Sequence, residues 1–77
     1  MLTLYYDPTC PYCRKVLEAG EELGVTFNKK NVEELGVEDE LIAKTGKTQV
    51  PFLIDDETGK ELFESNTIVE YLHERFG

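Results

Sequence analysis

A chain of 77 residues with a net charge of −8 is expected to form one small domain, and its acidity argues against nucleic acid or an anionic membrane as a partner. Apolar residues make up 40% of the chain, which is normal for a globular protein. The acidic residues are expected to form a solvated surface. No apolar run reaches the length of a membrane-spanning helix.

The spacing of the apolar residues, with the glycines and turns between them, predicts seven elements. In chain order these are a strand at 1–6, a helix at 11–23, a strand at 25–31, a helix at 34–45, a strand at 51–55, a strand at 60–64 and a last helix that is capped by Ser65 or Thr67. The pair Lys29-Lys30 is typical of a strand at the edge of a sheet. Thr67 and Glu70 have the spacing of a capping box. A strand–helix–strand crossover followed by a hairpin implies an α/β fold, with a mixed sheet and helices on both faces.

The only two cysteines lie in the motif Cys10-Pro11-Tyr12-Cys13, where the first strand gives way to the first helix. Two thiols separated by two residues at such a junction are the arrangement of thiol–disulfide exchange. Cys10 falls near the N-cap, where unpaired N–H groups and the positive end of the helix dipole favour a thiolate, and Pro11 at the first helical position removes no needed donor. We therefore expect Cys10 to be the exposed, readily ionised nucleophile and Cys13 the shielded resolving partner.

Other uses of the two thiols have less support. A structural disulfide needs an oxidising compartment, but the first residues do not resemble a signal peptide, so a cytoplasmic location is expected. A zinc site within the chain would have to recruit carboxylates, because His73 is the only histidine and there is no second cysteine pair. Metal binding and inert thiols stay open as alternatives, and neither a metal nor a flavin is expected.

The motif, the order of elements and the segment Thr48-Gln49-Val50-Pro51 before the third strand make the chain resemble a dithiol glutaredoxin. The resemblance covers essentially the whole chain. It implies a single glutaredoxin-like domain over residues 1–77 with the thioredoxin fold, built on a four-stranded mixed sheet. From Glu64 onward, the sequence is closer to the glutathione-binding half of glutathione transferases than to the Gly-Gly segment of many glutaredoxins.

The resemblance also implies a glutathione site. A cis peptide bond between Val50 and Pro51 would place Val50 beside Cys10, where its backbone could pair with glutathione as a short added strand. Glu64 and Ser65 would hold the charged ends of the γ-glutamyl group at a helix N-terminus. Ser65 could equally serve only as a helix cap. The residues expected to contact glutathione are Tyr12, Gln49, Val50, Pro51, Glu64 and Ser65.

One residue departs from the glutaredoxin pattern. Asp7 stands where glutaredoxins usually have a lysine, three residues before the nucleophile. An acid there should disfavour the thiolate and repel the glycyl carboxylate of glutathione. Arg14, one turn into the helix, could compensate, and together with Pro11 it is expected to tune the thiolate. We expect weaker binding of glutathione but retained activity.

The implied function is glutathione-dependent reduction of protein–glutathione mixed disulfides and of some protein disulfides. Glutathione would be the co-substrate, no cofactor would be bound, and the partners would be glutathionylated or disulfide-bonded proteins. The chain is expected to act as a monomer. One alternative is a thioredoxin-like electron donor that is reduced by a flavoenzyme, for example for ribonucleotide reductase. Less favoured alternatives are an iron–sulfur carrier and a transferase-like module that binds glutathione.

Overall fold

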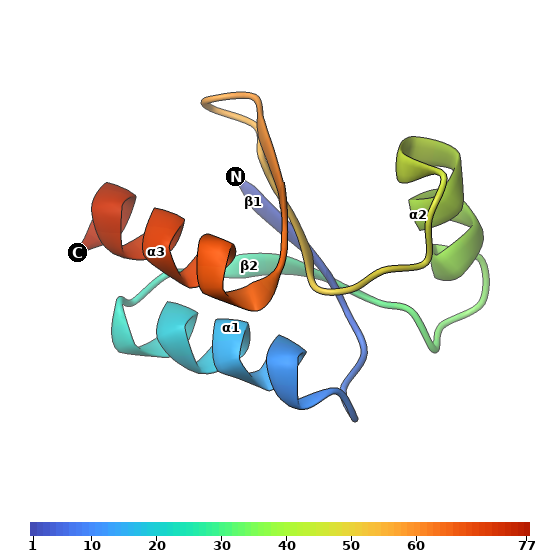
Figure 1. Cartoon of the computed structure of the whole chain (residues 1–77), viewed down its shortest axis with the longest axis horizontal. Coiled ribbons are helices and arrows are strands. Elements are labelled where there is room, and N and C mark those ends of the chain that lie inside the picture. The colour runs from blue at the N-terminus through green and yellow to red at the C-terminus, as the bar shows by residue number, and fades with distance from the viewer.

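Four strands form one mixed sheet in the computed structural model, which describes all 77 residues. In chain order the elements are β1 (Leu2–Tyr6), α1 (Pro11–Glu22), β2 (Phe27–Asn31), α2 (Val37–Thr45), β3 (Phe52–Asp55), β4 (Lys60–Phe63) and α3 (Ser65–Phe76). The strand order is β2-β1-β3-β4; β1 runs parallel to β2, and the other two pairings are antiparallel. Helices α1 and α3 lie side by side, with α2 apart from them (Figure 1). The predicted α/β class and element order are confirmed.

Successive side chains of each strand point to opposite faces of the sheet, so the core is divided into two layers. On the face covered by α1 and α3, the buried apolar side chains are Leu2, Leu4, Val16, Ala19, Phe27, Leu53, Ile68 and Leu72. The opposite face holds a smaller cluster of Tyr5, Leu41 and Phe52 under α2. The hydroxyl group of Tyr5 donates a hydrogen bond to Glu40 of α2 at 2.5 Å, which satisfies the one polar atom of this buried ring.

The starts of three elements differ from the sequence prediction, while the other predicted boundaries lie within one residue of the observed ones. Helix α2 begins at Val37 rather than at residue 34, because Gly36 has φ of +86° and so cannot lie inside a helix. Strand β2 begins at Phe27 instead of Val25. Helix α3 begins at Ser65 with Glu64 in the N-cap position, so Thr67 lies inside the helix and the predicted capping box does not form. Only Glu64 lies between β4 and α3, and its side chain makes no capping hydrogen bond.

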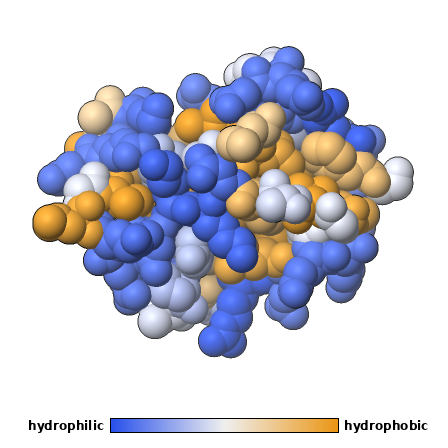
Figure 2. Space-filling view, turned by 180° about the vertical axis from the view of Figure 1, so that it is seen from behind, coloured by the Kyte–Doolittle hydropathy of each residue, from blue (hydrophilic) through white to orange (hydrophobic).

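The surface is mainly hydrophilic. Strand β2 is an edge strand, as the two lysines predicted, and Lys30 Nζ lies 3.6 Å from the carboxylate of Glu40. On the face turned away from the viewer of Figure 1, apolar residues gather mainly on the half that lies away from α2 (Figure 2). None of the three helices combines the length and the apolar character that crossing a membrane demands.

A buried carboxylate fastens the end of α3 to the hairpin between β3 and β4. Asp55 is 1% exposed, and its Oδ2 accepts hydrogen bonds from the Tyr71 hydroxyl at 2.5 Å and from Arg75 Nε at 2.7 Å. Its Oδ1 accepts from the N–H of Glu57 at 3.0 Å, and Arg75 also forms an ion pair with the Glu57 side chain. Arg75 therefore does more than place a cation at the C-terminal end of the helix dipole.

These contacts set the ionisation of Asp55. Burial alone would raise the pKa of this carboxyl, but the hydrogen bonds from Tyr71 and the Glu57 N–H and the charge of Arg75 outweigh it and lower the pKa. Because the pKa is lower in the folded state than in the unfolded state, the stabilisation is present above the unfolded value. It is lost as the pH falls through the folded value.

We predict that Asp55→Ala lowers the free energy of unfolding at neutral pH by about 2–3 kcal/mol, since it removes one partner of a largely buried ion pair. The loss should shrink as the medium is acidified through the range in which Asp55 titrates. Urea unfolding at several pH values measures both effects. Asp56→Ala, at an exposed neighbouring acid, is the matched control and should change stability by less than about 0.5 kcal/mol. Equal effects of the two substitutions would contradict this account.

Candidate functional site

The two cysteines occupy the positions that the motif predicted. Cys10 is the N-cap of α1, with extended φ and ψ of −85° and 122°, and Pro11 is the first helical residue. The carbonyl of Cys10 accepts the first helical hydrogen bond from the N–H of Arg14 at 3.1 Å. Cys10 is half-buried, Cys13 is fully buried, and both thiols are free. Cys10 is therefore the more accessible sulfur, at a helix end whose N–H groups lack partners.

The buried thiol is held in its protonated form. Burial raises the pKa of Cys13 to about 11, and the neighbouring Cys10 and the negative charge of Asp7 act in the same direction. Only the N–H of Asp7, which donates to Cys13 Sγ at 3.4 Å, opposes this rise. At neutral pH Cys13 is therefore a weak nucleophile.

We predict that alkylation of Cys13 by iodoacetamide, measured in Cys10→Ser, accelerates about tenfold per pH unit from about pH 7 to about pH 10, because only the thiolate reacts. Burial is the largest cause of the raised pKa, so removing Cys10 leaves this behaviour in place. Free glutathione, treated in parallel, should level off near about pH 9 because its thiol is unperturbed. A Cys13 rate that also levels off there would contradict the prediction.

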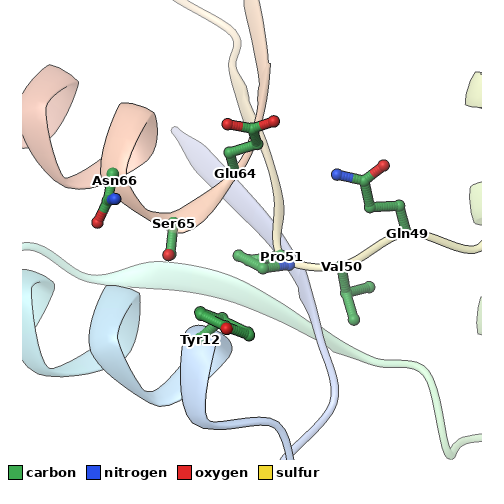
Figure 3. A pocket seen from close by; sticks show the side chains of 7 residues that line it. All are labelled: Tyr12, Gln49, Val50, Pro51, Glu64, Ser65 and Asn66. Atoms are coloured by element: carbon green, nitrogen blue, oxygen red, sulfur yellow. The ribbon is translucent and has the colours of Figure 1, made fainter.

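A cleft of about 270 Å³ lies beside the motif. It is lined by residues from the start of α1, the loop before β3 and the start of α3: Tyr12, Gln49, Val50, Pro51, Glu64, Ser65 and Asn66 (Figure 3). The Val50–Pro51 peptide bond is cis, as predicted. Val50 lies just outside β3, which begins at Phe52. The structure thus brings together all six residues that the resemblance assigned to glutathione.

The side chains of the cleft point in different directions. The hydroxyl of Ser65 points toward Tyr12, whereas the carboxylate of Glu64 points away from Tyr12, to the same side as the amide of Gln49 (Figure 3). Tyr12 is 63% exposed and forms an outer wall of the cleft. Glu64 is the only charged residue among the seven that line the cleft.

Asn66 lines the cleft although no sequence pattern had pointed to it. Asn66 Oδ1 accepts a hydrogen bond from Lys15 Nζ at 3.1 Å, which joins α3 to α1 next to the cleft. Only the packing of these helices reveals this pair, since the residues are far apart in sequence. Pro11 and Arg14 are exposed and lie outside the cleft, and Arg14 forms no ion pair. Their influence on the Cys10 thiolate stays a prediction.

Glu64 has a backbone conformation that is normally reserved for glycine. Its φ is +72° and its ψ is 127°, and it is the only residue other than glycine with a positive φ. A side chain in such a region costs about 1–3 kcal/mol and persists where the surroundings enforce it, most often at functional sites. Here the enforced turn joins the end of β4 to the start of α3, which lines the cleft.

We predict that Glu64→Gly raises the free energy of unfolding by about 1 kcal/mol, because relief of the strain exceeds the added entropy of glycine in the unfolded chain. Glu64→Gln keeps the strain and removes only the charge, so its stability should match that of the wild type. Chemical denaturation of the three proteins provides the comparison. A destabilised Glu64→Gly would show that the conformation carries no strain.

Residues 4–77 match the family described as glutathione S-transferase, N-terminal domain. The stringent starvation protein A homolog of Coxiella burnetii is 37% identical over 76 residues, which are 99% of this chain and 35% of that protein. A delta-class glutathione transferase of Nilaparvata lugens superposes with a TM-score of 0.83 at 36% identity, over 100% of this chain and 37% of that one. The glutathione transferase URE2P6 of Phanerochaete chrysosporium, solved with oxidized glutathione, gives 0.80 at 29% identity, over 97% and 36%.

These matches extend the similarity to glutathione transferases over more of the chain than the sequence analysis expected. The similarity to glutathione transferases, expected only from Glu64 onward, covers nearly the whole chain, and the fold is the thioredoxin-like fold of their N-terminal domain. The chain spans about a third of the length of the relatives it matches. None of these matches is to a glutaredoxin. The assignment of a glutaredoxin-type activity therefore depends on the residues of the site themselves.

Proposed function

We propose that this chain, which belongs to the family of the glutathione S-transferase N-terminal domain, is a glutathione-dependent thiol–disulfide oxidoreductase. The observation that carries the proposal is the position of Cys10, half-buried at the N-terminus of α1 with a second, buried thiol beneath it and a cleft alongside. Conjugation by a transferase requires the thiolate of glutathione itself and gives no role to a pair of protein thiols. Disulfide exchange requires such a pair or at least its outer member.

Glutathione suits the cleft in its chemistry. The first N–H groups of α3 have no partners within the helix, and with the Ser65 hydroxyl they can receive the α-carboxylate of the γ-glutamyl group. The Glu64 carboxylate can receive the ammonium group. The backbone at Val50, outside the sheet, can pair with the cysteinyl residue as an added strand. The solved transferase that contains oxidized glutathione adds support, because it shares this fold.

The proposed reaction converts a protein–glutathione mixed disulfide and one free glutathione into the protein thiol and oxidised glutathione. The Cys10 thiolate attacks the glutathione sulfur of a protein–glutathione mixed disulfide; the new S–S bond forms as the old one breaks, and the substrate protein leaves as a thiolate that takes up a proton. A second glutathione, as its thiolate, then attacks the glutathione sulfur bound to Cys10. This step releases oxidised glutathione and restores the Cys10 thiolate, so the chain itself undergoes no net change.

Cys13 contributes mainly to protein disulfides. In that case it attacks Cys10 within the mixed disulfide, which frees the substrate and leaves an internal disulfide. Because burial keeps Cys13 protonated at neutral pH, the thiol must lose its proton before it can attack. As part of the proposal, the chain acts as a monomer in a reducing compartment such as the cytoplasm, where both thiols stay free.

We predict that Cys10→Ser abolishes turnover of a glutathione mixed disulfide, with a loss of at least about a thousandfold, since the nucleophile is removed. Cys13→Ser should keep more than about a third of the wild-type rate because glutathione completes the cycle. Turnover coupled to glutathione reductase and its nicotinamide cofactor measures both. The pair of variants is matched, because each exchanges one sulfur for oxygen.

The same assay distinguishes the alternatives. Equal inactivity of both variants would favour a thioredoxin-like donor that needs its internal disulfide. A wild type that is inactive with glutathione but is reduced by a flavoenzyme would reject the proposal. A visible absorption spectrum of the anaerobically purified protein tests for the iron–sulfur alternative, and the proposal expects a colourless protein.

A further inference from the structure

Asp7 contacts the dithiol motif, and the residue just before it, through three of its groups. Its N–H donates to Cys13 Sγ at 3.4 Å, and its carbonyl oxygen accepts from the N–H of Cys10 at 3.0 Å. Its carboxylate oxygen Oδ1 accepts from the N–H of Thr9 at 2.9 Å and from the Thr9 hydroxyl at 2.8 Å. One residue therefore touches three positions of the segment that runs from β1 into α1.

The loop of residues 7–10 has few other ties. Pro8 lacks a backbone donor, and it restricts the preceding Asp7 to extended conformations. Thr9 is exposed, and the Asp7 carboxylate is its only hydrogen-bond partner among side chains. Without the carboxylate, no side chain would hold Thr9, the residue that directly precedes Cys10, and only the backbone bond from the Cys10 N–H to the Asp7 carbonyl would close the turn.

From the sequence, the Asp7 carboxylate was expected only to disfavour the thiolate. In the structure it also holds Thr9. The hydrogen bonds from Thr9 lower the pKa of Asp7, so the group stays ionised and bonded to Thr9 at neutral pH. Its negative charge still raises the pKa of Cys13 as a minor effect. The Asp7 carboxylate therefore has two separate effects: it holds Thr9 in place, and its charge raises the pKa of Cys13.

We infer that Asp7 is a positioning residue for the dithiol reaction, because its carboxylate holds the loop through Thr9 and so fixes the direction in which Cys10 meets the disulfide. Disulfide exchange needs the attacking sulfur in line with the leaving sulfur, and small errors in alignment are costly to the rate. The inference rests on the proposed role of Cys10 as the nucleophile. A lysine at this position would bring a cation to the site, but it would lack the acceptor that Thr9 needs.

Substitutions at two residues separate position from charge. Asp7→Ala removes the acceptor and should lower kcat for a glutathione mixed disulfide about tenfold, with KM changed less than about threefold. Asp7→Asn keeps an oxygen acceptor without the charge, and should restore kcat to within about threefold of the wild type. Thr9→Val keeps only the backbone N–H donor, so its kcat should lie between those of Asp7→Ala and Asp7→Asn. Thr9→Ser keeps both donors and is the conservative variant.

Controls and a second assay complete the experiment. Asp39→Ala makes the same change in net charge at an exposed residue of α2 and should leave kcat unchanged. Thermal unfolding followed by circular dichroism verifies each variant, and the exposed Thr9 keeps the test available if Asp7→Ala does not fold. Alkylation of Cys10 by iodoacetamide at neutral pH measures its reactivity without glutathione, and Asp7→Ala should be the slowest variant there too.

The outcomes separate the two proposals. If Asp7→Asn is as slow as Asp7→Ala, the charge matters rather than the position and the inference is overturned. A wild-type kcat in Asp7→Ala would overturn it as well. If the wild type turns over no mixed disulfide but alkylation follows the expected order of variants, the positioning of Cys10 stands and the oxidoreductase proposal is rejected.

Discussion

The packing of α1 against α3 on one face of the sheet is the constraint on which the site depends. Both helices cover the same buried apolar layer, and their N-terminal ends meet on the same side of the molecule. Tyr12 near the start of α1 and Ser65 at the start of α3 therefore line one cleft, although more than fifty residues separate them. The bond between Lys15 and Asn66 joins the two helices beside it. Two positive helix ends thus converge where a thiolate and a carboxylate are expected to lie.

This convergence explains how a strongly acidic chain can present a site for anions. The net charge is −8, and the only charged residue that lines the cleft is the acid Glu64. Attraction for an anion must therefore come from backbone N–H groups, which carry their partial charge regardless of side-chain composition. A surface rich in carboxylates is compatible with anion binding as long as the helix ends stay open.

The site also contains the places where local rules are broken. Glu64 has a backbone conformation suited to glycine, and Cys13 is a buried thiol whose neighbours keep it protonated. An acid, Asp7, precedes the thiolate position. Such exceptions in an otherwise regular fold tend to gather at functional sites, because the rest of the structure must enforce them. Here the packed helices α1 and α3 provide those surroundings.

The sequence by itself determined the elements, the edge strand at Lys29-Lys30 and the position of Cys10 at a helix N-terminus, because these follow from periodicity and from local backbone chemistry. The cis bond before Pro51 and the glutathione residues were reachable only through the resemblance to known proteins. Tertiary structure alone decided the start of α3 at Ser65, the pairing of Asp55 with Arg75 and the place of Asn66 in the cleft. Those features depend on contacts between segments that are distant in the chain, and no local pattern of residues records which distant partner a side chain will meet.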